Sequence, residues 1–384
     1  MVSISAPGKV ILFGEHAVVY GCPALATSID ASTTLKFHRI IPNDDSDVAF
    51  NLNFTNYIDR SISLKISDFL SDFPPNSIGS DIHSFFLTKS QNILSKLDVP
   101  SQIVQSVAVI LFSCYLLQSR HHVRRIAGLP CDITLTSTLP ISAGLGSSAA
   151  YCSVVAALFL YLHGCITGPN LTEDDLFLVR SFANELEKIM HASPSGVDTS
   201  ISTSGGMVWF KKNITDGSTF IRSLSTSLLS DNLPKLLIIN TNTPRSTADV
   251  VNSVQKFREC KPELCNQIFE NISAICKKAE DIFSSPLDKD SLNVLSMLFL
   301  QNHDALCKLG VSNEALDEIV RRLRSIDFGA KITGAGRGGC VIALPCKTAD
   351  SSDAVDRVRN LLQDLNVTIF ETTFCAPGIR MQIS

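Results

Sequence analysis

Two short segments of this chain of 384 residues combine glycines with groups that can bind an anion. The first, Gly144-Leu-Gly-Ser-Ser148, comes after an expected strand and directly before an apolar run that predicts a helix. The first N–H groups of a helix have no partner within it and lie at the positive end of its dipole, so a phosphate group binds well there. A glycine turn with a serine N-cap fits the same residues equally well. The segment alone leaves both alternatives open.

The second segment, KITGAGRGGCVI over residues 331–342, has four glycines between residues 334 and 339. It separates two expected strands, which predicts a hairpin loop with several positive φ angles. A flexible turn without a ligand is the simpler interpretation, whereas two glycine loops in different halves of the chain favour a shared ligand. The chain has no Walker A string G-x-x-x-x-G-K-[ST]. A Rossmann fingerprint would be G-x-G-x-x-G in an early βαβ unit, whereas the first segment has Ala149 in the last place and lies in the middle of the chain.

Three charged side chains suit the chemistry of phosphate transfer. Lys9 follows an expected turn, where it is either an exposed loop charge or a buried cation beside a hydroxyl group. Asp198 ends an expected loop that begins at His191, and an aspartate in a turn is most often a local hydrogen-bond acceptor. Glu187 lies near the end of an expected helix. Carboxylates and a serine hydroxyl are ligands for Mg²⁺ in phosphoryl transfer, but the spacing alone does not bring these groups together.

The composition is that of a globular protein without a bias toward large anionic partners. Hydrophobic residues make up 45% and charged residues 18%, the net charge is -4, and the mean hydropathy is +0.20. A nucleic acid or an anionic membrane is therefore not an expected partner. The longest apolar runs, 107–117 and 154–162, are shorter than the roughly 18–20 residues that span a bilayer, so we expect core helices.

The cysteines and both ends of the chain bear on its compartment. Lys9, Glu15 and His16 interrupt the N-terminal apolar residues, so no secretion signal is expected. The twelve cysteines include no C-x-x-C pair, which predicts reduced, mostly buried thiols and neither a disulfide framework nor a zinc site. The ending Met381-Gln-Ile-Ser384 is not a peroxisomal Ser-Lys-Leu signal. We expect a cytoplasmic protein.

Strands and helices alternate in both halves of the sequence without strict βαβ regularity, which favours an α+β architecture. Residues 42–60 predict a loop or irregular hairpin, and the Ser/Thr/Asn-rich residues 217–234 are a candidate domain boundary. Strands are expected over 2–5, 10–13, 17–20, 131–137, 205–210, 236–240, 331–333, 340–345 and 367–374. Helices are expected over 102–117, 147–163, 172–190, 248–257, 262–284, 293–309 and 314–325.

Three segments together resemble the three motifs of the GHMP kinases, the family of galactokinase, homoserine kinase, mevalonate kinase and phosphomevalonate kinase. They are APGKVILFGEH at residues 6–16, LPISAGLGSSA at 139–149 and KITGAGRGG at 331–339. Residues 14–21, 191–199 and 240–247 resemble the mevalonate kinase branch in particular. Ile141 departs from the second motif, which usually has a proline there, and Phe13 stands where some relatives have a polar ring.

The resemblance implies a two-domain GHMP kinase fold. We expect an N-terminal ribosomal-protein-like α/β domain over residues 1–225 and a ferredoxin-like C-terminal domain over residues 226–384. The implied activity is ATP-dependent phosphorylation of the C5 hydroxyl of (R)-mevalonate with Mg²⁺, an early step toward isoprenoid and sterol precursors. Another GHMP small-molecule kinase, or a non-catalytic nucleotide-binding sensor on the same scaffold, is the alternative. A homodimer and inhibition by isoprenoid diphosphates are implied as well.

The resemblance also implies a role for each matching residue. Asp198 would take or orient the proton of the substrate hydroxyl, and Lys9 would stabilise the developing alkoxide. Ser148, rather than Ser147, would bind Mg²⁺ together with Glu187. The implied ATP-binding residues are Ala143, Gly144, Leu145, Gly146, Ser147 and Ser148; the substrate-binding residues are Lys9, Glu15, His16, Ser195, Asp198, Arg245 and Thr247; and the glycines of the loop near the phosphates are Gly334, Gly336, Gly338 and Gly339.

Overall fold

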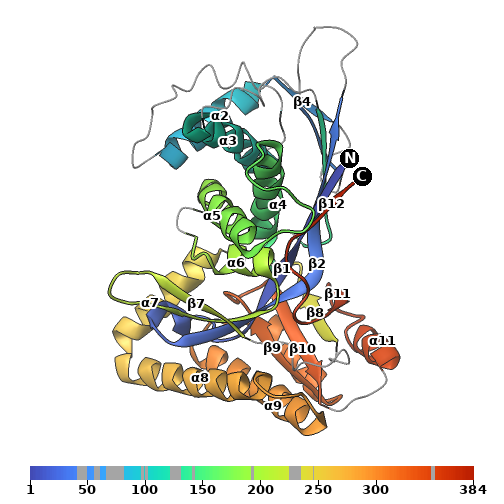
Figure 1. The fold of residues 1–384 in the computed structure, drawn as a ribbon. Coiled ribbons are helices and arrows are strands. Elements are labelled where there is room, and N and C mark those ends of the chain that lie inside the picture. Colours follow the sequence, from blue (N-terminus) through green and yellow to red (C-terminus); the bar gives the residue numbers. More distant parts are fainter. Residues whose placement is uncertain are drawn as a thin grey trace.

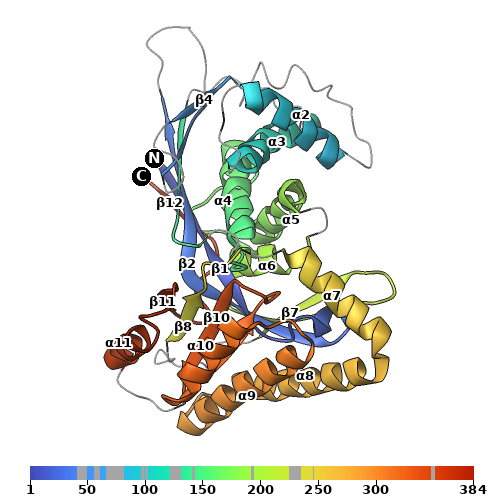
Figure 2. The same cartoon turned by 180° about the vertical axis from the view of Figure 1, so that it is seen from behind.

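The computed structural model describes most of the chain: residues 1–40, 50–55, 61–65, 82–96, 99, 103–121, 131–140, 143–191, 194–224, 235–244, 246–346 and 351–384, without the side chains of 93, 96, 118–121 and 351–353. In this part the chain forms a larger and a smaller sheet, and helices pack against each (Figures 1 and 2). Arg245, Ile141 and the predicted boundary between residues 225 and 226 lie outside the described residues.

The larger sheet has the strand order β12-β1-β2-β5-β3-β4, and β6 pairs with β2 and β7 with β6. All neighbours are antiparallel except β3 and β5. Buried residues alternate with less buried ones along β5, as the predicted strand requires when one face is covered. The strands are β1 (Val2–Phe13), β2 (Pro23–Arg39), β3 (Phe50–Phe54), β4 (Ile62–Leu64), β5 (Cys131–Ser137), β6 (Met207–Lys212), β7 (Thr219–Leu224) and β12 (Arg380–Ile383).

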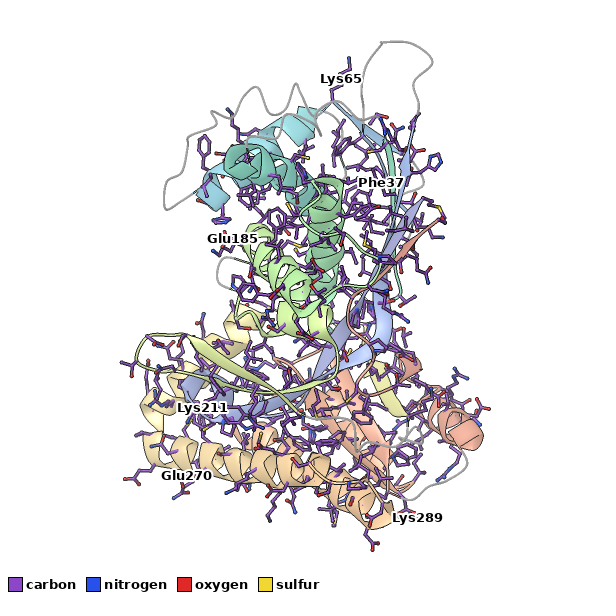
Figure 3. All side chains as sticks on the ribbon, viewed as in Figure 1. Phe37, Lys65, Glu185, Lys211, Glu270 and Lys289 are labelled. Carbon is purple, nitrogen blue, oxygen red and sulfur yellow. The ribbon has the colours of Figure 1, made fainter. Side chains whose placement is uncertain are left out.

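The helices α2 (Ile82–Lys96), α3 (Val104–His121), α4 (Ser147–Leu162), α5 (Glu173–Met190) and α6 (Val197–Ser204) gather beside this sheet (Figure 1). The central one is α4, which is apolar almost all round and packs between α3, α5, α6 and the strands β1 and β2. The helix α5 begins with a capping box formed by Thr172 and Asp175, as its sequence predicts. Figure 3 shows side chains filling the space between these helices and the sheet.

The smaller sheet has the strand order β11-β8-β10-β9 and is antiparallel throughout. Its strands are β8 (Leu236–Asn240), β9 (Phe328–Thr333), β10 (Cys340–Pro345) and β11 (Thr368–Thr372). Together with five helices this sheet forms the second domain. The helices are α7 (Thr247–Cys260), α8 (Pro262–Phe283), α9 (Lys289–Lys308), α10 (Glu314–Arg324) and α11 (Ser351–Leu361). Both α9 and α10 pack against β9 and β10.

The far end of the β1–β2 hairpin joins the two domains. Phe13, at the end of β1, is fully buried, and its ring meets that of Phe299 in α9 edge-on at 5.3 Å between centroids. Tyr20 stacks on Phe269 of α8 at 4.9 Å. Because aromatic rings bury large apolar areas, these contacts tie the strand that carries Lys9 to the second domain.

Three sequence predictions about the first strands and the domain boundary are wrong. The expected turn at residues 6–9 lies inside the continuous strand β1, which absorbs its Pro-Gly pair as a register shift between Pro7 and Gly8. The expected strand 17–20 is a short 3-10 helix, η1 (Ala17–Tyr20). Part of the candidate boundary, β7, is a strand of the larger sheet, and so is β12, which pairs with β1 rather than with the predicted second domain.

Two broader predictions concern hydropathy and thiols. In the described part of the chain, the apolar helices belong to the core, and none is long and apolar enough to cross a membrane. All twelve cysteines lie in described residues and are free thiols, and six of them are buried. The prediction that the chain lacks disulfides is confirmed.

Candidate active site

Lys9 and Asp198 form an ion pair between the first strand and a short helix. The Lys9 Nζ lies 3.2 Å from the Asp198 Oδ2, and the side chains are 8% and 31% exposed. Asp198 is in the first turn of α6, not in the predicted loop, and Gly196 begins that helix with φ of 76°. The Ser202 hydroxyl of α6 donates to the Pro7 carbonyl at 2.9 Å, which anchors the helix to β1. The lysine is therefore buried, whereas its carboxylate partner still faces solvent.

The first glycine segment lies directly against Lys9. The Lys9 N–H donates to the Leu145 carbonyl at 2.8 Å. A Cβ at Gly146 would lie 2.9 Å from the Lys9 Cγ, and one at Gly8 would lie 2.6 Å from the Leu145 oxygen. Only glycine permits this approach, and Gly146 also has φ of +75°, which side chains disfavour.

The start of α4 distinguishes the two interpretations of that segment. The N-cap is Gly146, without a side-chain hydrogen bond, so a serine-capped turn is not what forms. Ser147 and Ser148 are instead the first helical residues, where the backbone N–H groups have no intrahelical partner. This positive helix end, next to the buried cation Lys9, suits a phosphate group.

Ser148 also meets two side chains from the end of α5. Its hydroxyl lies 3.4 Å from the Glu187 Oε1 and 3.1 Å from the His191 Nε2. Glu187 is only 4% exposed. Burial, and next the Asp198 carboxylate, raise its pKa to about 7, although Lys9 and the Ser148 hydroxyl act in the opposite direction. The sequence analysis gave His191 no role, because a histidine in a loop carries no signal without its partner.

The oxygen atoms of Ser148 and Glu187 fit a magnesium ion as ligands. Mg²⁺ binds oxygen ligands, and Ser148 and Glu187 present a hydroxyl and a carboxylate oxygen side by side. Burial and the nearby Asp198 carboxylate disfavour the charged form of Glu187, and Lys9 and the Ser148 hydroxyl compensate for this only in part. A bound cation would supply that compensation.

Glu15 lies deeper, in a buried ion pair with Lys331 at the junction of the two domains. Both side chains are at most 1% exposed, and the second Glu15 oxygen accepts a hydrogen bond from the Asn302 Nδ2 at 3.2 Å. Burial lowers the Lys331 pKa, and the Glu15 carboxylate opposes that shift. Because both oxygens are engaged by protein groups, the role of Glu15 in binding substrate stays a prediction.

His16 connects the first motif to the second glycine segment. Its Nε2 lies 2.8 Å from the Ala335 carbonyl, and the Thr333 hydroxyl donates to the Ile11 carbonyl at 2.8 Å. The segment is the predicted hairpin loop, with positive φ at its four glycines, Gly334, Gly336, Gly338 and Gly339. The loop is thus fixed to the strand that carries Lys9, while its position relative to bound phosphates stays a prediction.

Two more of the predicted substrate residues, Ser195 and Thr247, lie at the surface. Ser195 is exposed, and its hydroxyl accepts from the Val197 N–H at 3.4 Å, just before α6. Thr247 is the exposed first residue of α7. Their contact with substrate, like that of Arg245, stays a prediction.

Comparisons with known proteins identify the family of the chain. The profile for the GHMP kinases N terminal domain matches residues 110–206, and that for GHMP kinases C terminal matches residues 272–364. The chain is 31% identical to the mevalonate kinase of Bos taurus and 30% identical to that of Homo sapiens, over 98% of this chain and 93% of each relative.

Solved structures extend the likeness to the fold. A mevalonate kinase from Methanococcus jannaschii superposes with a TM-score of 0.70 at 26% identity, covering 100% of this chain and 98% of the other. A Lactococcus lactis galactokinase complexed with galactose, at 15% identity and a TM-score of 0.63 over 98% of this chain and 94% of the other, shares the fold alone. The chain belongs to the GHMP kinases and, within them, to the mevalonate kinase family.

Proposed function

We propose that this protein transfers the γ-phosphoryl group of ATP to the C5 hydroxyl of (R)-mevalonate, giving 5-phosphomevalonate and ADP. The observation that carries the proposal is the Lys9–Asp198 pair beside the uncapped start of α4. Similarity to mevalonate kinases over 98% of the chain supports the choice of alcohol.

In this reaction, Asp198 accepts or orients the proton of the attacking hydroxyl. Its carboxylate is part exposed, so a substrate can reach it, and Lys9 fixes its position from the buried side. As the proton leaves, the Lys9 ammonium stabilises the negative charge on the alkoxide oxygen. The protein does little covalent chemistry itself, and its contribution is position and charge.

The phosphates of ATP bind at the start of α4. The first-turn N–H groups, from Ser147 onward, donate to phosphate oxygens, and the glycines 144 and 146 let the backbone come close. A Mg²⁺ ion held by Ser148 and Glu187 would neutralise part of the charge of the β- and γ-phosphates.

Two alternatives remain distinct from this proposal. A kinase for another small alcohol could have the same fold, as the galactokinase does, and would differ in the alcohol that it phosphorylates. A nucleotide-binding sensor without activity would have no need for a carboxylate held against a buried lysine, so the intact Lys9–Asp198 pair argues against it.

An ADP-release assay tests the proposal. The purified chain is supplied with ATP, Mg²⁺ and, in turn, mevalonate, phosphomevalonate, galactose or homoserine. We expect turnover with mevalonate well above that with the other three, and turnover at least about 10³-fold lower from an Asp198→Asn protein purified in the same way. Equal or higher turnover of another alcohol would assign the chain to a sibling activity, and ATP binding without turnover of any of them would support the sensor.

Three further properties belong to the proposal: a homodimer, a cytoplasmic location and inhibition by isoprenoid diphosphates. A diphosphate group would occupy the same start of α4 as the phosphates of ATP, so inhibition should be competitive with ATP. Light scattering of the purified protein measures its oligomeric state, and ADP release at several ATP concentrations measures the competition.

A further inference from the structure

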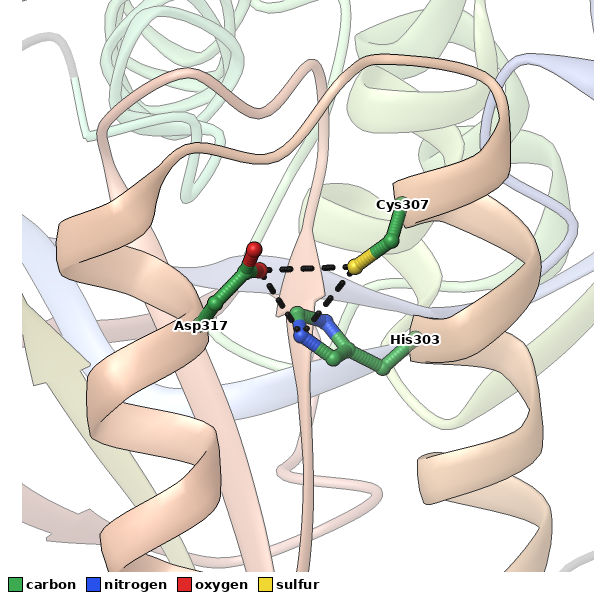
Figure 4. A group of neighbouring side chains, drawn as sticks. All are labelled: His303, Cys307 and Asp317. Atoms are coloured by element: carbon green, nitrogen blue, oxygen red, sulfur yellow. Dashed lines mark hydrogen bonds and ion pairs between the residues drawn. The ribbon is translucent and has the colours of Figure 1, made fainter.

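A second group of metal-binding side chains lies outside the candidate active site, between α9 and α10. His303 and Cys307 are one helical turn apart on α9, and Asp317 is in the first turn of α10 (Figure 4). The structure brings the His303 Nε2, the Cys307 Sγ and an Asp317 carboxylate oxygen within 4.8 Å of one another.

The three atoms already have the spacing of one face of a tetrahedral site. The His303 Nε2 lies 3.2 Å from the Asp317 Oδ1, the Cys307 Sγ lies 3.3 Å from that oxygen, and the sulfur and the ring nitrogen are 3.5 Å apart. Zinc–ligand distances of about 2.0–2.3 Å in a tetrahedron place neighbouring ligand atoms about 3.3–3.6 Å apart. A metal ion could therefore bind with little movement of the side chains.

We propose that His303, Cys307 and Asp317 bind a transition-metal ion of the Zn²⁺ class, at a site separate from that for Mg²⁺. The thiol and imidazole are ligands that such ions prefer and that Mg²⁺ avoids. A thiolate and a carboxylate together neutralise a divalent ion, which keeps the cost of binding at this half-buried position low. The Asp317 side chain is 51% exposed, so a water molecule can reach the site as a fourth ligand.

Without a metal, the same atoms form a hydrogen-bonded cluster. One carboxylate oxygen, Asp317 Oδ1, then faces His303, the Cys307 thiol and the Ser312 hydroxyl together. Metal binding would replace the thiol proton, which is released to solvent, and would leave Ser312 as an outer partner of the carboxylate.

The site has a structural consequence because the turn between α9 and α10 supports the second glycine segment. The Val311 carbonyl accepts from the Arg337 N–H at 2.8 Å, and the Arg337 side chain donates to the Gly310 carbonyl at 2.9 Å. A Cβ at Gly336 would lie 2.0 Å from the Val311 oxygen, so the fit is close. A metal ion across this turn would hold it, and with it the loop, in one position.

Metal titration of the whole protein tests this. The protein, without an affinity tag and kept reduced, is stripped with EDTA, desalted and titrated with Co²⁺. A thiolate bound to Co²⁺ gives a near-ultraviolet charge-transfer absorption that oxygen and nitrogen ligands do not give. We expect this band to saturate at one Co²⁺ per chain, to be abolished by Zn²⁺, and to be accompanied by a rise in the midpoint of thermal unfolding.

Two variants and a matched control assign the ligands. Cys307→Ser should abolish the band, and it should weaken Zn²⁺ binding at least about 100-fold, since losing even an outer partner costs roughly 10–100-fold. Asp317→Asn should keep the band but weaken binding, and because Asp317 is half exposed this variant should fold normally. Cys260→Ser, which removes the exposed cysteine, should change neither property.

The outcome that overturns the proposal is equally defined. Absence of the band in the wild-type protein, or a band that survives in Cys307→Ser, would show that the cluster is held by hydrogen bonds alone. Circular dichroism of each variant without Zn²⁺ or Co²⁺, and its ADP release with Mg·ATP, confirm that it is folded.

Discussion

Lys9 and Lys331 each form an ion pair with a carboxylate that is distant in the sequence, but the surroundings of the two pairs differ. Asp198 is 31% exposed beside the uncapped start of α4, whereas Glu15 is 1% exposed and shares its charge with Lys331 and Asn302. In the first pair, the lysine is fixed and the carboxylate remains accessible. In the second, both partners are sealed between the domains.

The difference shows how one pair of residue types can have two functions. A buried ion pair adds little net stability, but it penalises any arrangement that separates its partners, and Glu15 and Lys331 come from different domains. An ion pair that solvent can reach carries a smaller desolvation cost, and its carboxylate remains accessible to a substrate. We infer that the Glu15–Lys331 pair sets the relative position of the two domains. The Lys9–Asp198 pair acts instead on the hydroxyl group that receives the phosphoryl group.

Asp198→Asn should show the largest effect. The amide keeps the shape of the side chain but can neither accept the proton nor hold the charge of Lys9, so kcat should fall about 10³–10⁴-fold. The midpoint of thermal unfolding and the affinity for ATP should change little. Steady-state ADP release and ATP titration measure these quantities, and a kcat within tenfold of the wild type would remove Asp198 from the proton transfer.

Lys331→Met should instead reduce stability. It leaves the Glu15 carboxylate buried without its cation, which costs about 3–5 kcal/mol of unfolding free energy. Urea denaturation measures the loss, and adding Glu15→Gln to the variant should recover part of it.

The matched change Lys9→Met sharpens the contrast. Its partner Asp198 can be hydrated, so we expect a loss of about 1 kcal/mol or less together with loss of turnover. If the two lysine variants lost equal stability, exposure would not be what distinguishes the pairs.

Glu187 predicts how the stability of the metal-free protein depends on pH. Its pKa is about 7 in the folded protein and near its ordinary value of 4.5 when unfolded, so the folded state binds the proton more tightly. Stability from this group is therefore present below pH 4.5 and is lost as the pH rises toward about 7, by about 3 kcal/mol. Urea denaturation in EDTA at pH 5 and 7.5 should show about 2 kcal/mol of this loss in the wild type, because part of it has already occurred at pH 5. A Glu187→Gln protein with the same slope would show that another group is responsible.

The two adjacent serines should give the smallest effects. Ser148→Ala removes a hydroxyl that lies against Glu187, so we expect the KM for Mg·ATP to rise about tenfold, the worth of one good hydrogen bond or ligand. Ser147→Ala should change it less than about twofold, since the role of Ser147 is in its backbone N–H. Kinetics at varied Mg·ATP measure both, and a larger effect at Ser147 would reverse the assignment.

Local patterns predicted much of the fold. The apolar run of α4, the capping box of α5 and the glycine-rich turn between β9 and β10 depend on neighbours a few residues away, so the sequence contains their whole signal. The resemblance to the GHMP kinases likewise indicated Lys9, Asp198, Ser148 and Glu187. The structure brings all four together in two contacts, Lys9–Asp198 and Ser148–Glu187.

Long-range pairings were not predictable in the same way. Lys331 lies 316 residues from Glu15, and nothing near either residue in the sequence indicates the other. The cluster of His303, Cys307 and Asp317 was not predicted either. C-x-x-C pairs were the pattern sought in the sequence, and the third member of this cluster comes from the next helix. The H-x-x-x-C spacing on one helix face was the available signal. The 3-10 helix η1 was missed because four apolar residues do not distinguish a strand from a helical turn.

The pairing of β12 with β1 has a consequence for how the protein is made. Within this sequence β1 is synthesised before the other strands, but the strand that covers its outer edge, with Val2 opposite Ile383, is synthesised only after the entire second domain. Until then, an unpaired edge of the larger sheet remains open to other chains, which is the usual route to misassembly. The first domain to begin folding is thus the last to be completed. A nascent chain that stalls within the second domain would therefore expose the same strand that later holds Lys9 in place.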